Sequence, residues 1–235
     1  MGFANLQLML DKSTEMAQER LIYSITAYME RQGMLPCRKE SAERTIAFAP
    51  TAAGWAVYDD CADRLDMAAL DGLGRTLTAK LHARAIGVMT ARSDHMLRLY
   101  SEGWLRDTYL TSRQEFARET GRGLVCRAHA IRWRAQLVKT ARVRDLADVF
   151  ARGHQQKETV FPELRRLLGL PEAACYGFAS LEEVKPDGQI TLYFCSSTTI
   201  RQPLWERLFK PHERVAPGML FFSKIFSKRR RPGEK

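Results

Sequence analysis

Between residues 44 and 109 the sequence alternates short apolar segments with connections of only a few residues. The pattern predicts five strands, over 45–48, 54–58, 85–90, 95–100 and 104–109. It also predicts one amphipathic helix over 67–81, where apolar residues recur every three or four positions. Parallel pairing would need a crossover of about a dozen residues or more at each step. We therefore expect an α+β fold, with an antiparallel sheet that carries this helix and buries Leu73 and Leu77.

Helical periodicity recurs outside this region. A helix is predicted over 13–32, with Ser13 or Thr14 as its N-cap. Residues 124–139 have two apolar stripes on opposite sides at 100° per residue, so we expect a sandwiched helix that buries both Ile131 and Trp133. The rest of a helical layer is expected over 143–152 and 159–168.

The segments after this layer are less regular. The turn sequence Pro186-Asp187-Gly188 favours a C-terminal hairpin between strands over 176–184 and 189–195. Residues 111–123 and 196–203 are the linker candidates. The resulting organisation has four parts: an N-terminal helix in 1–40, an α+β sheet domain in 41–121, a helical layer packed on the sheet in 122–200, and a basic tail in 201–235.

The net charge of +10 is unevenly distributed along the chain. Residues 113–153 have 10 basic and 4 acidic residues, a net charge of +6, and residues 201–235 have 10 and 3, a net charge of +7. Such asymmetry points to an anionic partner. The predicted contacts in the first block are Arg127, Arg132, Arg134 and Lys139, which lie on the two edges between the apolar stripes.

The basic tail combines apolar and cationic residues. Phe221, Phe222, Ile225 and Phe226 would share one helical face, and the cations of this segment are Lys224, Lys228, Arg229, Arg230 and Arg231. This pattern is typical of an interfacial helix on anionic lipid, of a peptide that docks in a partner's groove, or of an arm that contacts nucleic-acid phosphates. A frayed end that only packs its apolar part on the protein is the alternative.

Two clusters could carry chemistry. The carboxylates of Asp59, Asp60, Asp63, Asp66 and Asp71, followed by Asp94 and Asp107, could hold a metal, although their spacing fits no calcium loop and also suits helix capping. Cys126 and His129 lie three residues apart but lack a second ligand pair for zinc or an orienting partner for catalysis. Nucleotide-binding and hydrolase motifs do not occur. We predict no bound metal and no cofactor.

The cysteines and the distribution of apolar residues indicate the cellular compartment. Five widely spaced cysteines without a C-x-x-C pair indicate free thiols. The N-terminus has no basic region before its short apolar stretch, and no apolar run reaches 18 residues. We therefore expect a cytoplasmic protein without a transmembrane segment.

Three functions remain open. The leading hypothesis is a non-enzymatic binding or regulatory protein with a macromolecular interaction surface, and the expected partner is a protein. A nucleic-acid-binding protein is the second, favoured by a sequence pI of about 9.6 but opposed by the absence of aromatic residues interleaved with the basic blocks. A metal-dependent enzyme that uses the cluster Asp59–Asp66 is the third.

Overall fold

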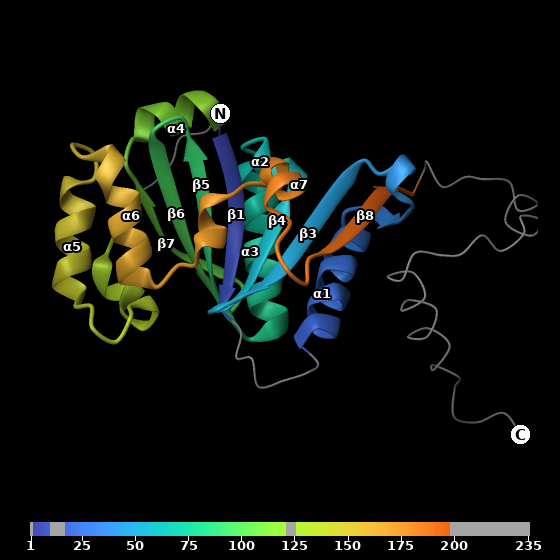
Figure 1. Ribbon diagram of the computed structural model, residues 1–235, viewed down its shortest axis with the longest axis horizontal. Helices are drawn as coiled ribbons and strands as arrows, with labels where there is room; N and C mark the ends of the chain where they lie inside the picture. Colours follow the sequence, from blue (N-terminus) through green and yellow to red (C-terminus); the bar gives the residue numbers. More distant parts are fainter. Residues whose placement is uncertain (1, 10–16, 121–125, 198–235) are drawn as a thin grey trace, which may run out of the picture. The chain divides into compact units, whose positions relative to one another are not determined.

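The computed structural model describes residues 2–9, 17–120 and 126–197, and Figure 1 shows their arrangement. Eight strands form one sheet in the order β2-β8-β3-β4-β1-β5-β6-β7, and every neighbouring pair is antiparallel. The strands are β1 (Gly2–Met9), β2 (Met34–Pro36), β3 (Arg44–Thr51), β4 (Gly54–Asp59), β5 (Arg84–Ala91), β6 (Asp94–Ser101), β7 (Trp104–Leu110) and β8 (Ile190–Ser196). The predicted α+β class and antiparallel sheet are confirmed.

Two-residue turns join β5 to β6 and β6 to β7. Ser101 pairs with Trp104 across the second turn, and the turn residues Glu102 and Gly103 have φ angles of 53° and 81°. Positive φ at both positions is the backbone that a type I′ turn requires, and its twist matches that of the flanking strands. The five strands predicted between residues 44 and 109 are confirmed as β3 to β7.

The central strand β1 is not among the predicted strands. It pairs with β4 on one side and β5 on the other. Leu6 and Leu8 enter one core, while Asn5, although polar, is also buried. The Asn5 side-chain amide donates to the backbone carbonyls of Ala174 at 3.1 Å and Tyr176 at 2.7 Å. These bonds make its burial tolerable, because a buried amide without a partner would be costly.

Helices α1 (Ala17–Arg31) and α3 (Met67–Leu81) cover one face of the sheet. The predicted bounds of α3 are confirmed, and Leu73 and Leu77 are buried as expected. The helix begins at its N-cap Asp66, whose carboxylate accepts from the amides of Ala68 and Ala69 at 2.9 and 3.2 Å. Helix α1 lies within the predicted range 13–32, but the proposed caps Ser13 and Thr14 lie outside the described residues.

The opposite face of β5, β6 and β7 is covered by α5 (Val143–Arg152), α6 (Lys157–Leu168) and the 3₁₀ helix η2 (Ala130–Gln136). Figure 1 shows α5 and α6 side by side at this end of the sheet. The helices predicted over 143–152 and 159–168 are confirmed. The remaining elements are α2 (Asp60–Asp63), α4 (Arg113–Thr120), α7 (Leu181–Val184), η1 (Lys39–Ser41), η3 (Glu172–Cys175) and η4 (Phe178–Ser180).

The predicted helix over 124–139 is wrong. Ala128 has a φ angle of 44°, and the helical part that the structure describes is the 3₁₀ segment η2. The backbone amides of Arg127 and Ala128 donate to the Thr108 carbonyl of β7 at 3.2 and 3.1 Å. The Ala128 amide is therefore unavailable for an α-helical ladder, and the segment follows the edge strand instead.

The predicted hairpin is also wrong, although its second strand is confirmed as β8. Residues 176–184 contain η4 and α7, and β8 pairs with β3 and β2. Leu181 packs on the side chains of Ala47, Ala56 and Tyr58. The apolar segment 176–184 thus packs on the sheet face over β3 and β4 and does not add a strand to the sheet.

The expected linker over 111–123 contains α4, and the second linker, 196–203, is described only to residue 197. The described residues up to Ser197 form one compact unit. The four-part division of the chain stays a prediction. Among the described residues, no helix combines the length and apolar character needed to cross a bilayer.

Candidate anion-binding surface

The carboxylate of Asp107 fixes η2 against β7. It accepts hydrogen bonds from the backbone amide of His129 at 2.7 Å, from the Trp133 indole at 2.9 Å and from the backbone amide of Thr108 at 2.9 Å. Trp133 is fully buried, as predicted, and its ring contacts Phe150 edge-on at 5.7 Å. Because η2 is held from its inner side, its outer side faces solvent.

Ile131 lies on that outer side and is 62% exposed. The prediction that Ile131 is buried is therefore wrong. In the predicted α-helix two apolar stripes would have faced two layers, but a 3₁₀ helix has about three residues per turn. With Trp133 directed into the core, Ile131 is left in solvent.

The segment from Cys126 to Arg144 carries the positive charge of this surface. It contains six basic residues and no acidic residue, and all six are exposed. They are Arg127, Arg132, Arg134, Lys139, Arg142 and Arg144. The first four are the contacts proposed from the sequence. Arg142 and Arg144 are additions that the same charge run, read a few residues further, could have supplied.

Three of these cations share one pocket of about 420 Å³. Arg134, Lys139 and Arg142 line it together with the apolar side chains of Leu137, Val138, Ala141 and Val143. Among the described residues that line the pocket, none is acidic. The nearby carboxylate of Asp145 accepts a hydrogen bond from the Arg142 backbone amide at 3.0 Å. An anion in this pocket would meet three positive side chains, and its hydration would be replaced by charged donors.

Two further arginines lie where η2 meets the sheet. The guanidinium of Arg132 donates to the carbonyl of Arg106 in β7 at 2.9 Å. Arg84, at the start of β5, donates to the carbonyl of Ala135 in η2 at 2.9 Å. Each guanidinium has five N–H donors, so both retain donors for a ligand. Arg84 could not be predicted from the basic segment, because only the fold brings β5 to η2.

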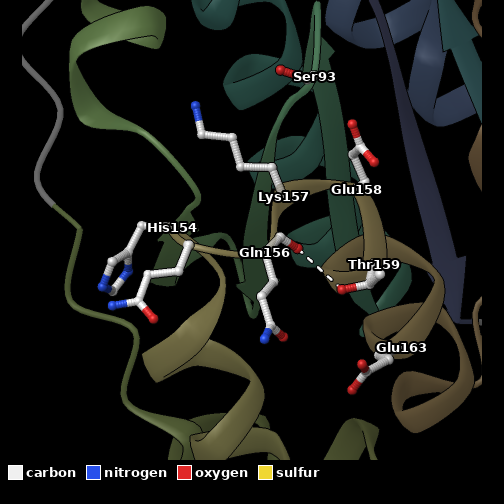
Figure 2. Close-up of a pocket in the computed structure, with 8 residues that line it drawn as sticks. Ser93, His154, Gln156, Lys157, Glu158, Thr159 and Glu163 are labelled. Carbon is white, nitrogen blue, oxygen red and sulfur yellow. Dashed lines mark hydrogen bonds between the residues drawn. The ribbon is translucent and has the colours of Figure 1, made fainter.

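A second, larger pocket of about 670 Å³ lies near the turn between β5 and β6 and is drawn in Figure 2. Two of its charged groups have structural partners: Lys157 pairs with Asp94 at 2.8 Å, and Glu163 pairs with Arg152. The Thr159 hydroxyl donates to the Gln156 carbonyl at 3.3 Å. In Figure 2 His154 and Glu163 lie on opposite sides of Gln156, so this acid and base do not converge.

The buried carboxylate of Asp94 and the ring of His95 serve separate contacts. Asp94 accepts from the Thr111 hydroxyl at 2.9 Å, in addition to Lys157. The His95 ring lies 3.1 Å from the Thr90 hydroxyl and stacks on Phe161 at 4.7 Å. Burial lowers the pKa of His95 to about 4, against the opposing charge of Asp94. A neutral, stacked imidazole at neutral pH fits a packing role.

In the acidic cluster at the end of β4, Asp59 already has a cationic protein partner. Asp59, Asp60 and Cys61 offer ligand atoms within 4.8 Å of one another, so the structure brings together two of the aspartates considered for a metal and adds a thiol. The Asp59 carboxylate, however, accepts two hydrogen bonds from buried Arg44. Burial lowers the pKa of Arg44, but the hydrogen bonds and charge of Asp59 raise it above its usual value, so the ion pair is retained. A metal would have to displace a cation that is already in place.

The other aspartates are distributed among separate partners. Asp63 accepts from the backbone amides of Ala4 at 3.0 Å and Ala179 at 3.1 Å. Asp71 accepts from the Tyr100 hydroxyl at 2.6 Å and pairs with Arg98 at 3.2 Å. Together with the capping role of Asp66 and the anchoring role of Asp107, these contacts use the carboxylates to join elements of the fold.

The proposed pair of Cys126 and His129 depended on a helix. Both residues precede η2 in extended or irregular backbone, so the spacing of three residues does not place them on one helical face. The Cys126 carbonyl accepts from Arg113 at 3.0 Å, and the His129 amide is bound to Asp107.

The proposed contacts in the tail lie outside the described residues. They are the cations Lys224, Lys228, Arg229, Arg230 and Arg231 and the apolar residues Phe221, Phe222, Ile225 and Phe226. Their part in binding stays a prediction. No known protein family, curated protein or solved structure matches this chain. Function is therefore inferred from the geometry of the described surface.

Proposed function

We propose that this protein is a non-enzymatic binding protein that engages an anionic macromolecule through the segment Cys126–Arg144. The observation that carries the proposal is the set of six exposed cations without an acidic neighbour in the segment. Three of them, Arg134, Lys139 and Arg142, line one pocket. A concentration of one sign of charge on a rigid surface attracts an oppositely charged partner and accelerates encounter.

The rigidity of the surface favours binding over a merely solvated charge run. The buried Trp133 and Asp107 hold η2 to the sheet, and Arg84 and Arg132 are fixed on backbone carbonyls. Side chains that are already ordered lose less conformational entropy when a ligand binds. The five free cysteines favour placing this role in the cytoplasm.

The test compares two triple variants of the full chain on immobilised heparin, a polyanion without bases. R134A/K139A/R142A removes the cations of the pocket. The control R20A/K39A/K80A removes three exposed cations from other elements and lowers the net charge equally. Each lost phosphate-like contact reduces the slope of log affinity against log salt by about 0.7 to 0.9. The pocket variant should elute at clearly lower salt, with a slope smaller by about 2 to 3.

The control variant should elute near the unmodified protein. Equal losses in both triple variants would attribute binding to net charge alone and would refute a local site. Retention of full affinity by the pocket variant would refute the proposal directly. Thermal melts of both variants test whether the fold is intact. We expect it to be, because the six side chains substituted in the two variants are all exposed.

A further inference from the structure

The start of β7 places a large aromatic side chain beside the basic surface. Trp104 is 63% exposed, although it belongs to a strand. Ser101 of β6 pairs with Arg84 of β5 on one side and with Trp104 of β7 on the other. Directly paired residues of an antiparallel sheet project from the same face. Trp104 and Arg84 therefore share one face, two strands apart, at about 10 Å between backbones.

That face is the one on which η2 packs. Met9, which pairs with Arg84, contacts the core beneath η2, α5 and α6. The Arg84 guanidinium reaches the Ala135 carbonyl of η2. From the other direction, Arg132 of η2 reaches the carbonyl of Arg106, two residues after Trp104. The indole of Trp104 thus lies in a region that an arginine from β5 and an arginine from η2 both approach.

The chemistry of this surface selects among anionic partners. An exposed indole offers a flat apolar face, and unpaired bases stack on such faces with little dependence on sequence. Five of the six cations in Cys126–Arg144 are arginines, whose planar forks match phosphate oxygens and also stack on rings. A membrane-binding surface would need a broader apolar face, whereas the large exposed apolar residues near these cations are Trp104 and Ile131.

We propose that this surface binds single-stranded nucleic acid, with one base stacked on Trp104 and the adjoining phosphates contacted by Arg84, Arg132 and the cations of the pocket. This inference rests on the proposed function and names its partner. A duplex fits less well, because its bases are already stacked on one another and unavailable to the indole.

The experiment measures fluorescence anisotropy of labelled oligo-dT and oligo-U of about 12 nucleotides, within the range of site sizes for such proteins. Heparin binding is measured in parallel, because heparin has the charge but no bases. W104A should weaken oligonucleotide binding about tenfold, the effect of losing one stacked base, and leave heparin binding unchanged. W104F should retain most of the affinity, because a phenyl ring still stacks. The matched control is Y23A, which removes a comparably exposed aromatic residue, at 60%, from helix α1 and should have no effect.

The variant R84A/R132A should weaken binding to both probes and reduce the salt slope for single strands by about 1.4. Preference for DNA or for RNA would both support the inference. It would be overturned by a W104A protein that binds oligonucleotides normally, by tighter binding to a duplex of equal length, or by binding to anionic vesicles that depends on Trp104 while oligonucleotide binding does not. If the pocket variant loses heparin binding while W104A binds oligonucleotides as tightly as the unmodified protein, the proposed function stands and only this inference is refuted.

Discussion

The contrast between Trp133 and Ile131 tests the account of η2 most directly. Trp133→Ala removes a fully buried indole and its hydrogen bond to Asp107. Truncation of a buried Trp costs about 3–5 kcal/mol, and loss of a hydrogen bond to a charged group costs about 1.5–3 kcal/mol. Ile131→Ala removes a side chain that is 62% exposed, so its cost should stay within about 0.5 kcal/mol.

Trp133→Phe separates the two contributions. It keeps an aromatic ring beside Phe150 but leaves Asp107 with the backbone amides of His129 and Thr108 only. We expect a loss of about 1.5–3 kcal/mol in the free energy of unfolding. Urea titrations followed by far-UV circular dichroism measure all three variants, since the readout does not depend on tryptophan fluorescence. A Trp133→Phe protein as stable as the unmodified one, or a loss above about 1.5 kcal/mol for Ile131→Ala, would contradict this packing of η2.

Two other predictions concern groups in the core. The pKa of His95 is about 4 in the folded protein, against about 6.5 when unfolded, so the unfolded chain binds more protons between these values. The contribution of His95 to the free energy of unfolding should therefore be complete above about pH 6.5 and fall by up to about 3 kcal/mol as the pH drops towards 4. In urea titrations, the stability of His95→Phe should depend less on pH in this window than that of the unmodified protein. An equal pH dependence would contradict the lowered pKa of His95. Gly74→Ala should destabilise α3, although Ala usually stabilises a helix by about 1 kcal/mol, because its Cβ would come within 2.8 Å of the buried Tyr100 ring. A rise in melting temperature for Gly74→Ala would show that Tyr100 can move aside.

Features encoded locally were predictable from the sequence. The apolar periodicity over 67–81 and the Asp66 N-cap define α3, because both act within a few residues of the chain. The short connections between residues 44 and 109 excluded crossovers, and the antiparallel order followed. The basic residues Arg127, Arg132, Arg134 and Lys139 are exposed, as expected of a charge run.

Features that depend on distant partners were decided by the tertiary structure. Residues 126–136 have apolar stripes that suit a helix, but Thr108 and Asp107 take the backbone amides that a helix would need. The segment 176–184 is apolar enough for a strand. It is not a strand, however, and Leu181 is buried because the segment covers the face of β3 and β4. In both cases one apolar side chain of the segment, Trp133 or Leu181, is buried by a different backbone from the one predicted. The free energy gained by burial depends on the apolar area removed from water and not on a particular secondary structure.

The candidate surface divides in the same way. The sequence by itself determined where the positive charge lies, since charge belongs to each residue wherever the chain takes it. It could not show an aromatic residue among the cations, because Trp104 and Arg84 lie 20 or more positions before the basic segment. Only the pairing of β5, β6 and β7, together with the packing of η2 on their face, brings them to it. Strand register acts between residues far apart in the chain, and local periodicity carries no information about which strands will meet.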